Sequence, residues 1–239
     1  MTEKSFAEQR DTVLKNLAHI RERIQRACDA ANRDPASVTL MAVTKTVSPD
    51  LINVALEAGV TTIGENRVQE FLGKREFLHL DGVDVQLIGN LQTNKVKQIV
   101  GKVSTIQSVD SLHLAQAIDK ESEKQGILTR VLVEVNVGGE ESKSGVAAIE
   151  TESLLREMAL LPHIHVSGLM AIPPITDIPT EKRRNFSILR QLFIDIAGKN
   201  IDNIDMDILS MGMSNDYYEA ILEGATMIRV GSSLFGARV

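Results

Sequence analysis

The feature that most constrains the fold is a regular alternation of short apolar stretches and helical patterns along the 239-residue chain. Strands separated by helical crossovers form parallel sheets, so this order predicts an α/β protein. The apolar stretches with the length of strands lie at 38–43, 60–64, 84–88, 103–108, 130–135, 163–168, 206–209 and 225–230. The helical patterns between them lie at 49–58, 66–78, 93–99, 111–125, 147–160, 180–197 and 214–223.

Eight such strands are enough to close a barrel, and the chain has the length of a compact one without a second domain. We therefore predict a single (β/α)8 TIM barrel domain over residues 1–239, with an open doubly wound sheet as the competing architecture. An additional amphipathic helix precedes the first strand and is expected to stop near Pro35. Its apolar positions include the only cysteine, Cys28, which we interpret as a core residue in a reducing compartment.

Composition and charge exclude several classes of function. The formal net charge of −6 argues against bulk electrostatic binding of nucleic acid. No apolar targeting core opens the chain and no apolar run reaches the ~18 residues that span a membrane, so we expect a cytoplasmic protein without membrane contact. The histidines are scattered except for His163 and His165, which enter a strand at its amino end, and we expect no metal site.

Polar and glycine-bearing segments follow every predicted strand. In a (β/α)8 barrel the carboxyl ends of the strands carry the functional residues, so these segments predict one site on one rim. The segments are Lys45, "GEN" (64–66), "IGNLQTNK" (88–95), "SVDS" (108–111), "VNVGGEESKSG" (135–145), "GLMAIPP" (168–174), "LSMGMSND" (209–216) and "RVGSSLFG" (229–236).

The last two segments predict an anion site, because phosphate sites in these barrels are commonly built by the loops after strands seven and eight. The hydroxyl groups and glycines that could form it are Ser210, Gly212 and Ser214 after the seventh strand, and Gly231, Ser232 and Ser233 after the eighth. We expect Ser214 to be the N-cap of the following helix, with Asp216 in its first turn. Two ordinary capped helix starts would be the alternative reading.

Arg229 should point into the barrel, because the strand alternation puts it on the same face as Met227 and Gly231. A buried guanidinium needs a partner. That partner could be Glu65, Glu134 or an acceptor on a ligand.

A lysine, a phosphate site and an inward arginine on one rim match what pyridoxal 5′-phosphate (PLP) requires. A partly desolvated lysine loses its proton more easily and can form a Schiff base. The pyridine nitrogen of PLP needs a facing group, which Arg229 could supply. A class I aldolase would use a similar lysine and also often binds phosphate, so spacing alone leaves it open; Arg229 favours the cofactor.

The rim motifs together resemble the pyridoxal phosphate homeostasis proteins (the YggS/PROSC family). The resemblance runs from about residue 8 to the C-terminus and rests on "AVTKTVS", "GENRVQE", "IGNLQTNK", "VDSLHLA", "VNVGGEESKSG", "GLMAIPP", "LSMGMSNDYYEAI" and "MIRVGSSLFG". It implies a PLP fold-type III barrel similar to the N-terminal domain of alanine racemase. It also implies a cytosolic PLP-binding protein without established catalytic activity, which helps control free PLP and its supply to other enzymes.

The resemblance assigns roles to particular residues. Lys45 matches the imine lysine, Asn66 a residue lining the cofactor, and Arg229 the arginine facing the pyridine nitrogen. The phosphate-binding positions match Ser210, Gly231 and Ser232. No catalytic residue is implied. The chain departs from the family's aromatic-His pair at Val85-Gln86 and from a common His at Asn90.

The main alternative to a PLP binder is an amino-acid racemase or another PLP enzyme. Racemisation needs two acid/base groups on opposite faces of the substrate. In the racemase one of them is a tyrosine from a second domain, which we expect this chain to lack, and we expect Tyr217 and Tyr218 only to pack their helix onto the barrel. We therefore expect a monomer that binds PLP and buffers it or delivers it to apo PLP-dependent enzymes, and we hypothesise that Lys143 or another rim lysine accepts the aldehyde transiently before release.

Overall fold

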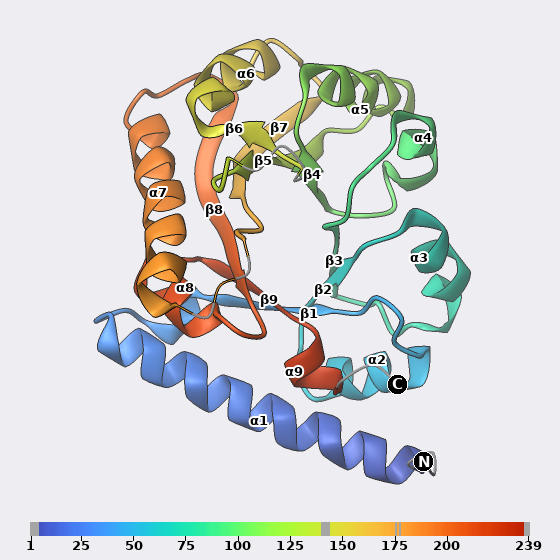
Figure 1. Ribbon diagram of the computed structural model, residues 1–239. Coiled ribbons are helices and arrows are strands. Elements are labelled where there is room, and N and C mark those ends of the chain that lie inside the picture. Colours follow the sequence, from blue (N-terminus) through green and yellow to red (C-terminus); the bar gives the residue numbers. More distant parts are fainter. Residues whose placement is uncertain (1–4, 140–143, 175, 177, 237–239) are drawn as a thin grey trace.

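The computed structural model describes residues 5–139, 144–174, 176 and 178–236 and contains a closed ring of parallel strands surrounded by helices (Figure 1). Neighbouring strands pair in parallel around the ring, and the pairings of β4 with β5 and of β9 with β1 close it. The strands of the ring are β1 (Thr39–Val43), β2 (Thr62–Glu65), β3 (Asp84–Leu87), β4 (Thr105–Val109), β5 (Thr129–Asn136), β7 (Ile164–Met170), β8 (Ile204–Met213) and β9 (Met227–Val230). The (β/α)8 barrel is confirmed, and the open sheet is excluded.

Two features of the strands were not expected. A two-residue strand, β6 (Val146–Ala147), pairs only with the carboxyl end of β5 and stands outside the ring. Strand β8 is also longer than the predicted 206–209, and its pairings with β7 and β9 contain register shifts. Such irregularities insert residues that break the strict alternation of inward and outward side chains. The full length of the strand therefore cannot be recognised from the alternation of apolar and polar residues.

Helices cover the outside of the ring, in the order predicted. They are α2 (Pro49–Glu57), α3 (Val68–Lys74), α4 (Val96–Ile99), α5 (Leu112–Gln125), α6 (Thr151–Met158), α7 (Pro179–Ala197), α8 (Tyr217–Leu222) and α9 (Ser232–Phe235). Short 3-10 turns complete several connections: η1 (Pro35–Ser37), η2 (Arg75–Phe77), η3 (Thr93–Lys95) and η4 (Ala148–Glu150). The predicted helices over 66–78 and 93–99 are therefore each divided into an α-helix and a 3-10 turn.

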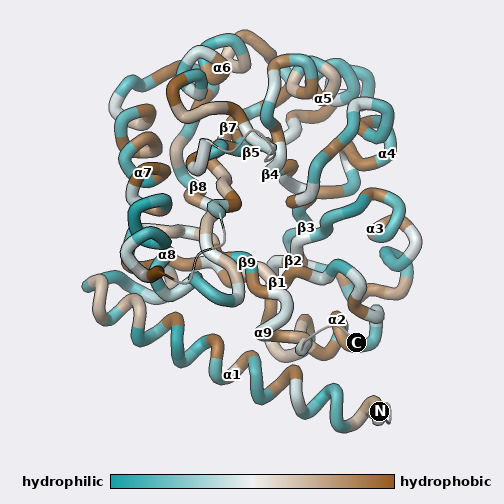
Figure 2. The backbone as a smooth tube through the Cα atoms, in the orientation of Figure 1, coloured by the Kyte–Doolittle hydropathy of each residue, from teal (hydrophilic) through white to brown (hydrophobic). Residues whose placement is uncertain are grey.

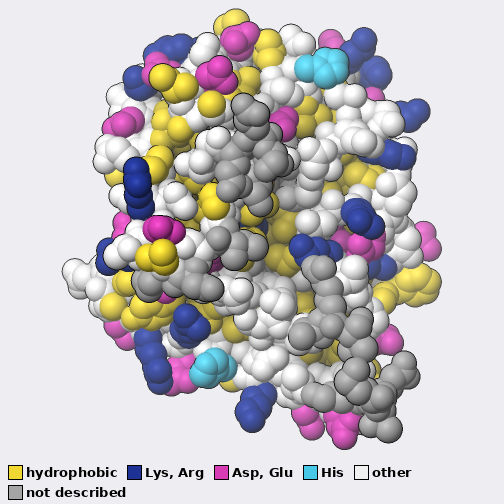
Figure 3. All heavy atoms as spheres, viewed as in Figure 1, with side chains coloured by type: hydrophobic (Ala, Val, Ile, Leu, Met, Phe, Trp, Pro, Cys, Tyr) yellow, Lys and Arg dark blue, Asp and Glu magenta, His cyan; other side chains and the backbone are white. Residues whose placement is uncertain are grey.

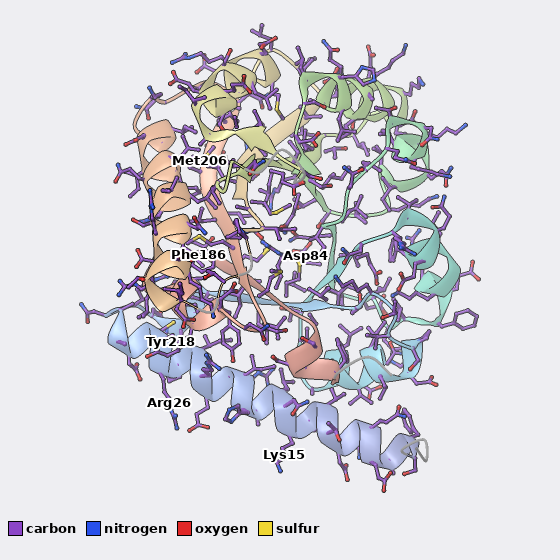
Figure 4. The ribbon with its side chains drawn as sticks, in the orientation of Figure 1. Lys15, Arg26, Asp84, Phe186, Met206 and Tyr218 are labelled. Atoms are coloured by element: carbon purple, nitrogen blue, oxygen red, sulfur yellow. The ribbon has the colours of Figure 1, made fainter. Side chains whose placement is uncertain are left out.

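The predicted N-terminal helix is α1 (Phe6–Ala30), which lies across one side of the barrel and contacts α2, α8 and α9 (Figure 1). A capping box between Ser5 and Glu8 starts it, because each side chain accepts from the other's backbone N–H. Hydrophobic residues, brown in Figure 2, recur along α1 among hydrophilic ones. The buried residues of the helix include Leu17 and Cys28, whose thiol is free, as expected. Lys15 and Arg26 point away from the barrel (Figure 4).

The hydrophobic core has two parts. The larger part fills the layer between the strands and the helices and includes Phe186 of α7, which is 1% exposed (Figure 4). The smaller part lies inside the ring and consists of Met41, Val43, Ile88 and Met227. Buried polar side chains, among them Gln86, Gln107 and Arg229, share the interior of the ring with these residues.

Candidate functional site

Lys45 lies at the carboxyl end of β1, two residues beyond Val43, the last residue of the strand. Its side chain is half-buried. The neighbouring Thr46 has a φ of 62°, a left-handed conformation that is unusual for a β-branched residue. The expected rim lysine is therefore present on a sharply turned segment.

The segments after β8 and β9 meet at the same rim and form a small cradle. The backbone N–H groups of Gly231 and Ser233 donate to Oγ of Ser214, at 3.3 and 3.2 Å. Ser232 is exposed and begins α9, with Gly231 as the N-cap. We call Ser214 and residues 231–233 the cradle.

Gly231 also brings the cradle close to the end of β1. A Cβ atom at this position would lie 3.3 Å from Cβ of Val43, which is tighter than an ordinary contact. The absence of a side chain at Gly231 thus lets the backbone that follows β9 approach the strand that carries Lys45. The lysine and the cradle belong to neighbouring strands of the ring.

The prediction that Ser214 is an N-cap is wrong. Helix α8 begins at Tyr217, and its N-cap is Asp216. The carboxylate of Asp216 accepts from the N–H of Met213 at 2.6 Å and closes a turn, so the helix starts later than the polar pattern suggested. The hydroxyl of Ser214 consequently turns toward the loop after β9 and serves the cradle.

Arg229 points into the barrel, as predicted, and is 3% exposed. It donates from Nη1 to Oγ of Ser210 at 2.7 Å and from Nη2 to the carbonyl oxygen of Ala171 at 2.8 Å. Both acceptors are neutral, so neither Glu65 nor Glu134 is its hydrogen-bonding partner. Burial lowers the pKa of Arg229 to about 10, against the opposing effect of Glu134 and then Asp216. The guanidinium thus stays protonated at neutral pH.

Glu134 is a second buried ionisable group in this region, at 6% exposure near the end of β5. Burial raises its pKa to about 7, and the negative charge of Asp110 adds to this, while Arg229 acts in the opposite direction. From its place in the sequence, Glu134 is only a possible partner of Arg229. Its protonation near neutral pH could not be inferred from the sequence.

Ser210 lies inside the ring rather than in the cradle. It is 0% exposed, and its hydroxyl accepts from Arg229 and donates to Oε1 of Gln107 at 2.7 Å. The structure therefore places Ser210 behind Arg229, and Ser214, four residues further along the same motif, is the serine that meets Gly231. Whether either serine binds a phosphate stays a prediction.

A directed chain of hydrogen bonds continues from Ser210 across the interior. Gln107 donates from Nε2 to Oε1 of Gln86 at 2.6 Å, and Gln86 donates from Nε2 to Oδ2 of Asp84 at 2.6 Å. Gln86 belongs to the pair that departs from the family pattern. The departure is accommodated because two glutamines can orient one another, with each amide using both its donor and its acceptor.

Asn66 follows β2 at the same rim and has an unsatisfied polar atom. Its Oδ1 is buried and has no hydrogen-bond partner among the described residues. The backbone of this residue fits closely against Gly89, where a Cβ atom would lie 2.1 Å from the carbonyl oxygen of Asn66. A buried amide oxygen without a partner is costly, so a ligand that donates to it would be favoured.

A buried lysine that was not expected from the sequence lies next to this site. Lys74 of α3 is 7% exposed, and its Nζ lies 2.9 Å from Oε1 of Glu65. The one signal in the sequence is that Lys74 occupies a position where the helical spacing of Val68 and Phe71 would place a buried residue. A lysine in a predicted helix is ordinarily expected to be exposed to solvent.

Several other expectations concern residues outside this site. The described residues contain no group of three or more His, Cys, Asp or Glu side chains that could hold a metal ion. No helix in the described part of the chain is long and apolar enough to cross a membrane. Tyr217 is 2% exposed, and Arg23 of α1 lies over the rings of both tyrosines, as their packing role requires. Lys143 lies outside the described residues.

The face in Figure 3 carries Lys and Arg side chains interspersed with Asp and Glu. Among the side chains coloured there, no continuous basic area is visible.

Comparison with known proteins places this geometry in a family. Residues 15–239 match the family described as "Alanine racemase, N-terminal domain". The pyridoxal phosphate homeostasis protein of Aquifex aeolicus is 44% identical over 224 residues, which cover 94% of this chain and 97% of the relative.

Two solved structures are also similar to this chain. An unknown protein from Bifidobacterium adolescentis has 35% identity and a TM-score of 0.93, with 98% of each chain covered. PipY of Synechococcus elongatus PCC7942, solved with PLP bound, has 31% identity and a TM-score of 0.82, and the similarity covers 94% of this chain and 100% of PipY. The chain therefore belongs to the pyridoxal phosphate homeostasis proteins (the YggS/PROSC family), whose barrel is that of the alanine racemase N-terminal domain.

Proposed function

We propose that this protein binds PLP at the carboxyl rim of the barrel, holds it as an imine on Lys45, and thereby buffers or delivers it within the cell. The observation that carries the proposal is the close approach of the cradle to the lysine-bearing strand, through the contact of Gly231 with Val43. An amine and an anion site on adjacent strands suit a small ligand with an aldehyde at one end and a phosphate at the other.

The residues present fit this ligand. The hydroxyl groups of Ser214 and Ser232 and the backbone N–H of Ser232 would hold the phosphate, and Gly231, whose own N–H donates to Ser214, would let the backbone approach it closely. We propose Ser214 here instead of Ser210 because the hydroxyl of Ser210 is bonded to Arg229 and Gln107 inside the ring. Arg229 would donate to the pyridine nitrogen, and the unpaired Oδ1 of Asn66 would accept from a polar group on the ring. When bound, PLP supplies an aldehyde that a primary amine captures reversibly. Nζ of Lys45 would form the C=N bond, and the aldehyde oxygen would leave as water.

The relatives support the same reading. The Aquifex aeolicus protein is named for pyridoxal phosphate homeostasis, and PipY has been solved with PLP bound. We propose that this chain shares both properties. We further propose that it acts as a monomer in the cytoplasm and supplies apo PLP-dependent enzymes. Its only cysteine is a buried free thiol, which suits a reducing compartment.

Binding without catalysis fits the electrostatics of the site better than racemisation does. A protonated Arg229 would donate a hydrogen bond to the pyridine nitrogen and so keep that nitrogen unprotonated, which would weaken the electron sink that carbanion chemistry uses. The rings of Tyr217 and Tyr218 in α8 pack against Arg23 of α1, which gives both tyrosines a packing role in place of that of the second base that racemisation needs. The match to the alanine racemase domain nevertheless makes racemase activity the second candidate.

One experiment tests both candidates. The purified protein is incubated with PLP, reduced with borohydride and digested, and the peptides are analysed by mass spectrometry. A reduced pyridoxyl adduct on Lys45 supports the proposal. Conversion of L-alanine or another amino acid to its enantiomer by the same preparation, in amounts that grow with enzyme concentration, would favour the racemase.

A further inference from the structure

A buried ion-pair network lies beside Lys45. Nζ of Lys74 contacts three oxygen atoms: Oε1 of Glu65 at 2.9 Å, Oε1 of Glu70 at 3.2 Å and the carbonyl oxygen of Thr44 at 2.8 Å. Glu65 is 0% exposed, and the side chain of Glu70 is 26% exposed. The network joins the end of β2 and helix α3 to the segment that follows β1.

The network holds the residue before Lys45. The N–H of Thr44 donates to the carbonyl oxygen of Gly64 at 3.1 Å, and its hydroxyl donates to Oε1 of Glu65 at 2.5 Å. The carbonyl group of Thr44, which belongs to the peptide bond joining it to Lys45, accepts from Lys74. The backbone on this side of Lys45 is therefore fixed at its N–H, its side chain and its carbonyl oxygen.

The network also holds the residue after Lys45. The N–H of Thr46 donates to Oε1 of Glu70 at 2.5 Å. Thr46 has a φ of 62°, which is strained for a β-branched side chain and persists only where surrounding contacts impose it. Strained backbone of this kind occurs at sites where a side chain must be aimed in a direction that relaxed backbone would not give.

We infer that Glu65, Glu70 and Lys74 are positioning residues that aim the amine of Lys45 at the cradle, an inference that rests on the proposed function. They act through the backbone of Thr44 and Thr46 and touch no ligand themselves. A purely structural role explains the contact between Lys74 and Glu65. A purely structural role does not explain why a carboxylate oxygen of Glu70 accepts a hydrogen bond from the N–H of Thr46, a strained residue next to Lys45.

Glu70 is the residue to change, because it is partly exposed and its loss leaves the pair of Lys74 and Glu65 intact. Glu70→Ala removes the acceptor for the N–H of Thr46, whereas Glu70→Gln keeps an oxygen in the same place. Glu152→Ala is the control, because Glu152 also pairs with a basic residue four positions along its helix, Arg156, and additionally with Lys199, but takes no part in the contacts that hold Thr44 and Thr46.

Three quantities are measured for each variant: the rate at which PLP becomes trapped on Lys45 by borohydride, the affinity for pyridoxine 5′-phosphate, and Tm. Pyridoxine 5′-phosphate has an alcohol in place of the aldehyde and cannot react with the lysine, so it reports on the cradle and ring contacts alone. We expect Glu70→Ala to slow trapping about tenfold, since misplaced reacting groups lose rate steeply. Its affinity for pyridoxine 5′-phosphate should stay within about twofold of the wild type, well under the energy of one hydrogen bond.

The conservative variant and the control decide the outcome. We expect Glu70→Gln to recover most of the trapping rate and Glu152→Ala to match the wild type. The inference is overturned if Glu70→Ala traps PLP at the wild-type rate, or if Glu70→Gln and Glu70→Ala lose equally. Failure of the proposed function has a different signature, because the wild-type protein itself would then neither trap PLP on Lys45 nor bind pyridoxine 5′-phosphate.

Discussion

At the scale of single residues, Arg229 has a structural role, and we propose a binding role for it as well. Its hydrogen bonds hold Ser210 and the backbone after β7, and its side chain is buried inside the ring. A guanidinium is suited to this because it keeps its charge when buried, whereas an ammonium loses its proton more readily. Burial lowers the pKa of Arg229 only to about 10, so its charge persists at neutral pH.

Replacing this side chain should weaken PLP binding. A hydrogen bond from a charged donor contributes about 1.5–3 kcal/mol, so we expect Arg229→Gln to raise the Kd of PLP by roughly 10- to 150-fold. Titration followed by absorbance measures the Kd, and a thermal melt shows whether the variant is folded. A folded Arg229→Gln protein with an unchanged Kd would show that Arg229 does not contact the ligand.

Glu134 should make stability depend on pH. Because its folded pKa is raised from 4.5 to about 7, the native state binds this proton more tightly than the unfolded state does. Stability is therefore highest below pH 4.5 with respect to this group and declines as pH rises to about 7. The shift corresponds to about 3 kcal/mol in the free energy of unfolding.

The variant Glu134→Gln isolates this effect, because other carboxyl groups remain in place. We expect it to gain stability relative to the wild type as pH rises from 5 to 8, measured by urea unfolding at several pH values. A difference between the two proteins that does not change with pH would mean that Glu134 titrates normally.

The residue types at the site could be read from the sequence, but some of their contacts could not. Lys45, Gly231 and Arg229 follow strands whose ends are fixed by the alternation of apolar residues, so the structure brings them to one end of the barrel as expected. Ser210 and Ser214 occur in one short motif, and only the irregular pairing of β8 decides that the first faces the interior. Whether these residues hold PLP stays a prediction.

At the scale of elements, α3 links the fold to the site through Lys74. Its side chain reaches across to Glu65 at the end of β2, and both groups are almost completely buried. Removing one partner of a buried ion pair leaves the other charge without compensation. The single substitution should therefore cost more than removal of both charges.

We expect Lys74→Met to lower the free energy of unfolding by about 3–5 kcal/mol near neutral pH. The loss should be smaller at pH 5, because burial raises the pKa of Glu65 and protonation removes its charge. The double variant Lys74→Met/Glu65→Gln should recover part of the loss. Chemical denaturation of the three proteins gives the comparison, and a double variant less stable than Lys74→Met would contradict it.

The boundaries of the helices could not be predicted accurately from the hydrophobic pattern. The division of the predicted helix over 66–78 into α3 and η2 depends on local hydrogen bonding that hydrophobic periodicity does not report. The late start of α8 depends on the carboxylate of Asp216, which closes a turn instead of joining the helix. The existence and order of the helices were predictable, because they follow from the need to cover a parallel sheet.

At the scale of the whole molecule, ring closure gathers contributions from distant parts of the sequence. Lys45 follows the first strand and the cradle belongs to the last two, yet β1 and β9 are hydrogen-bonded neighbours. Helix α1 supports the same region, because Asn16 donates from Nδ2 to the carbonyl oxygen of Leu234 in α9 at 3.0 Å. The eightfold pattern predicted this closure, since only a ring makes the first and last strands adjacent.

The most direct test of the account is to map where PLP attaches to the wild-type protein after borohydride reduction. At a substoichiometric amount of PLP, we predict a single dominant pyridoxyl adduct, on the peptide that contains Lys45. Excess inorganic phosphate should compete with its formation. An adduct spread over exposed lysines such as Lys15, with no preference for Lys45, would contradict the account.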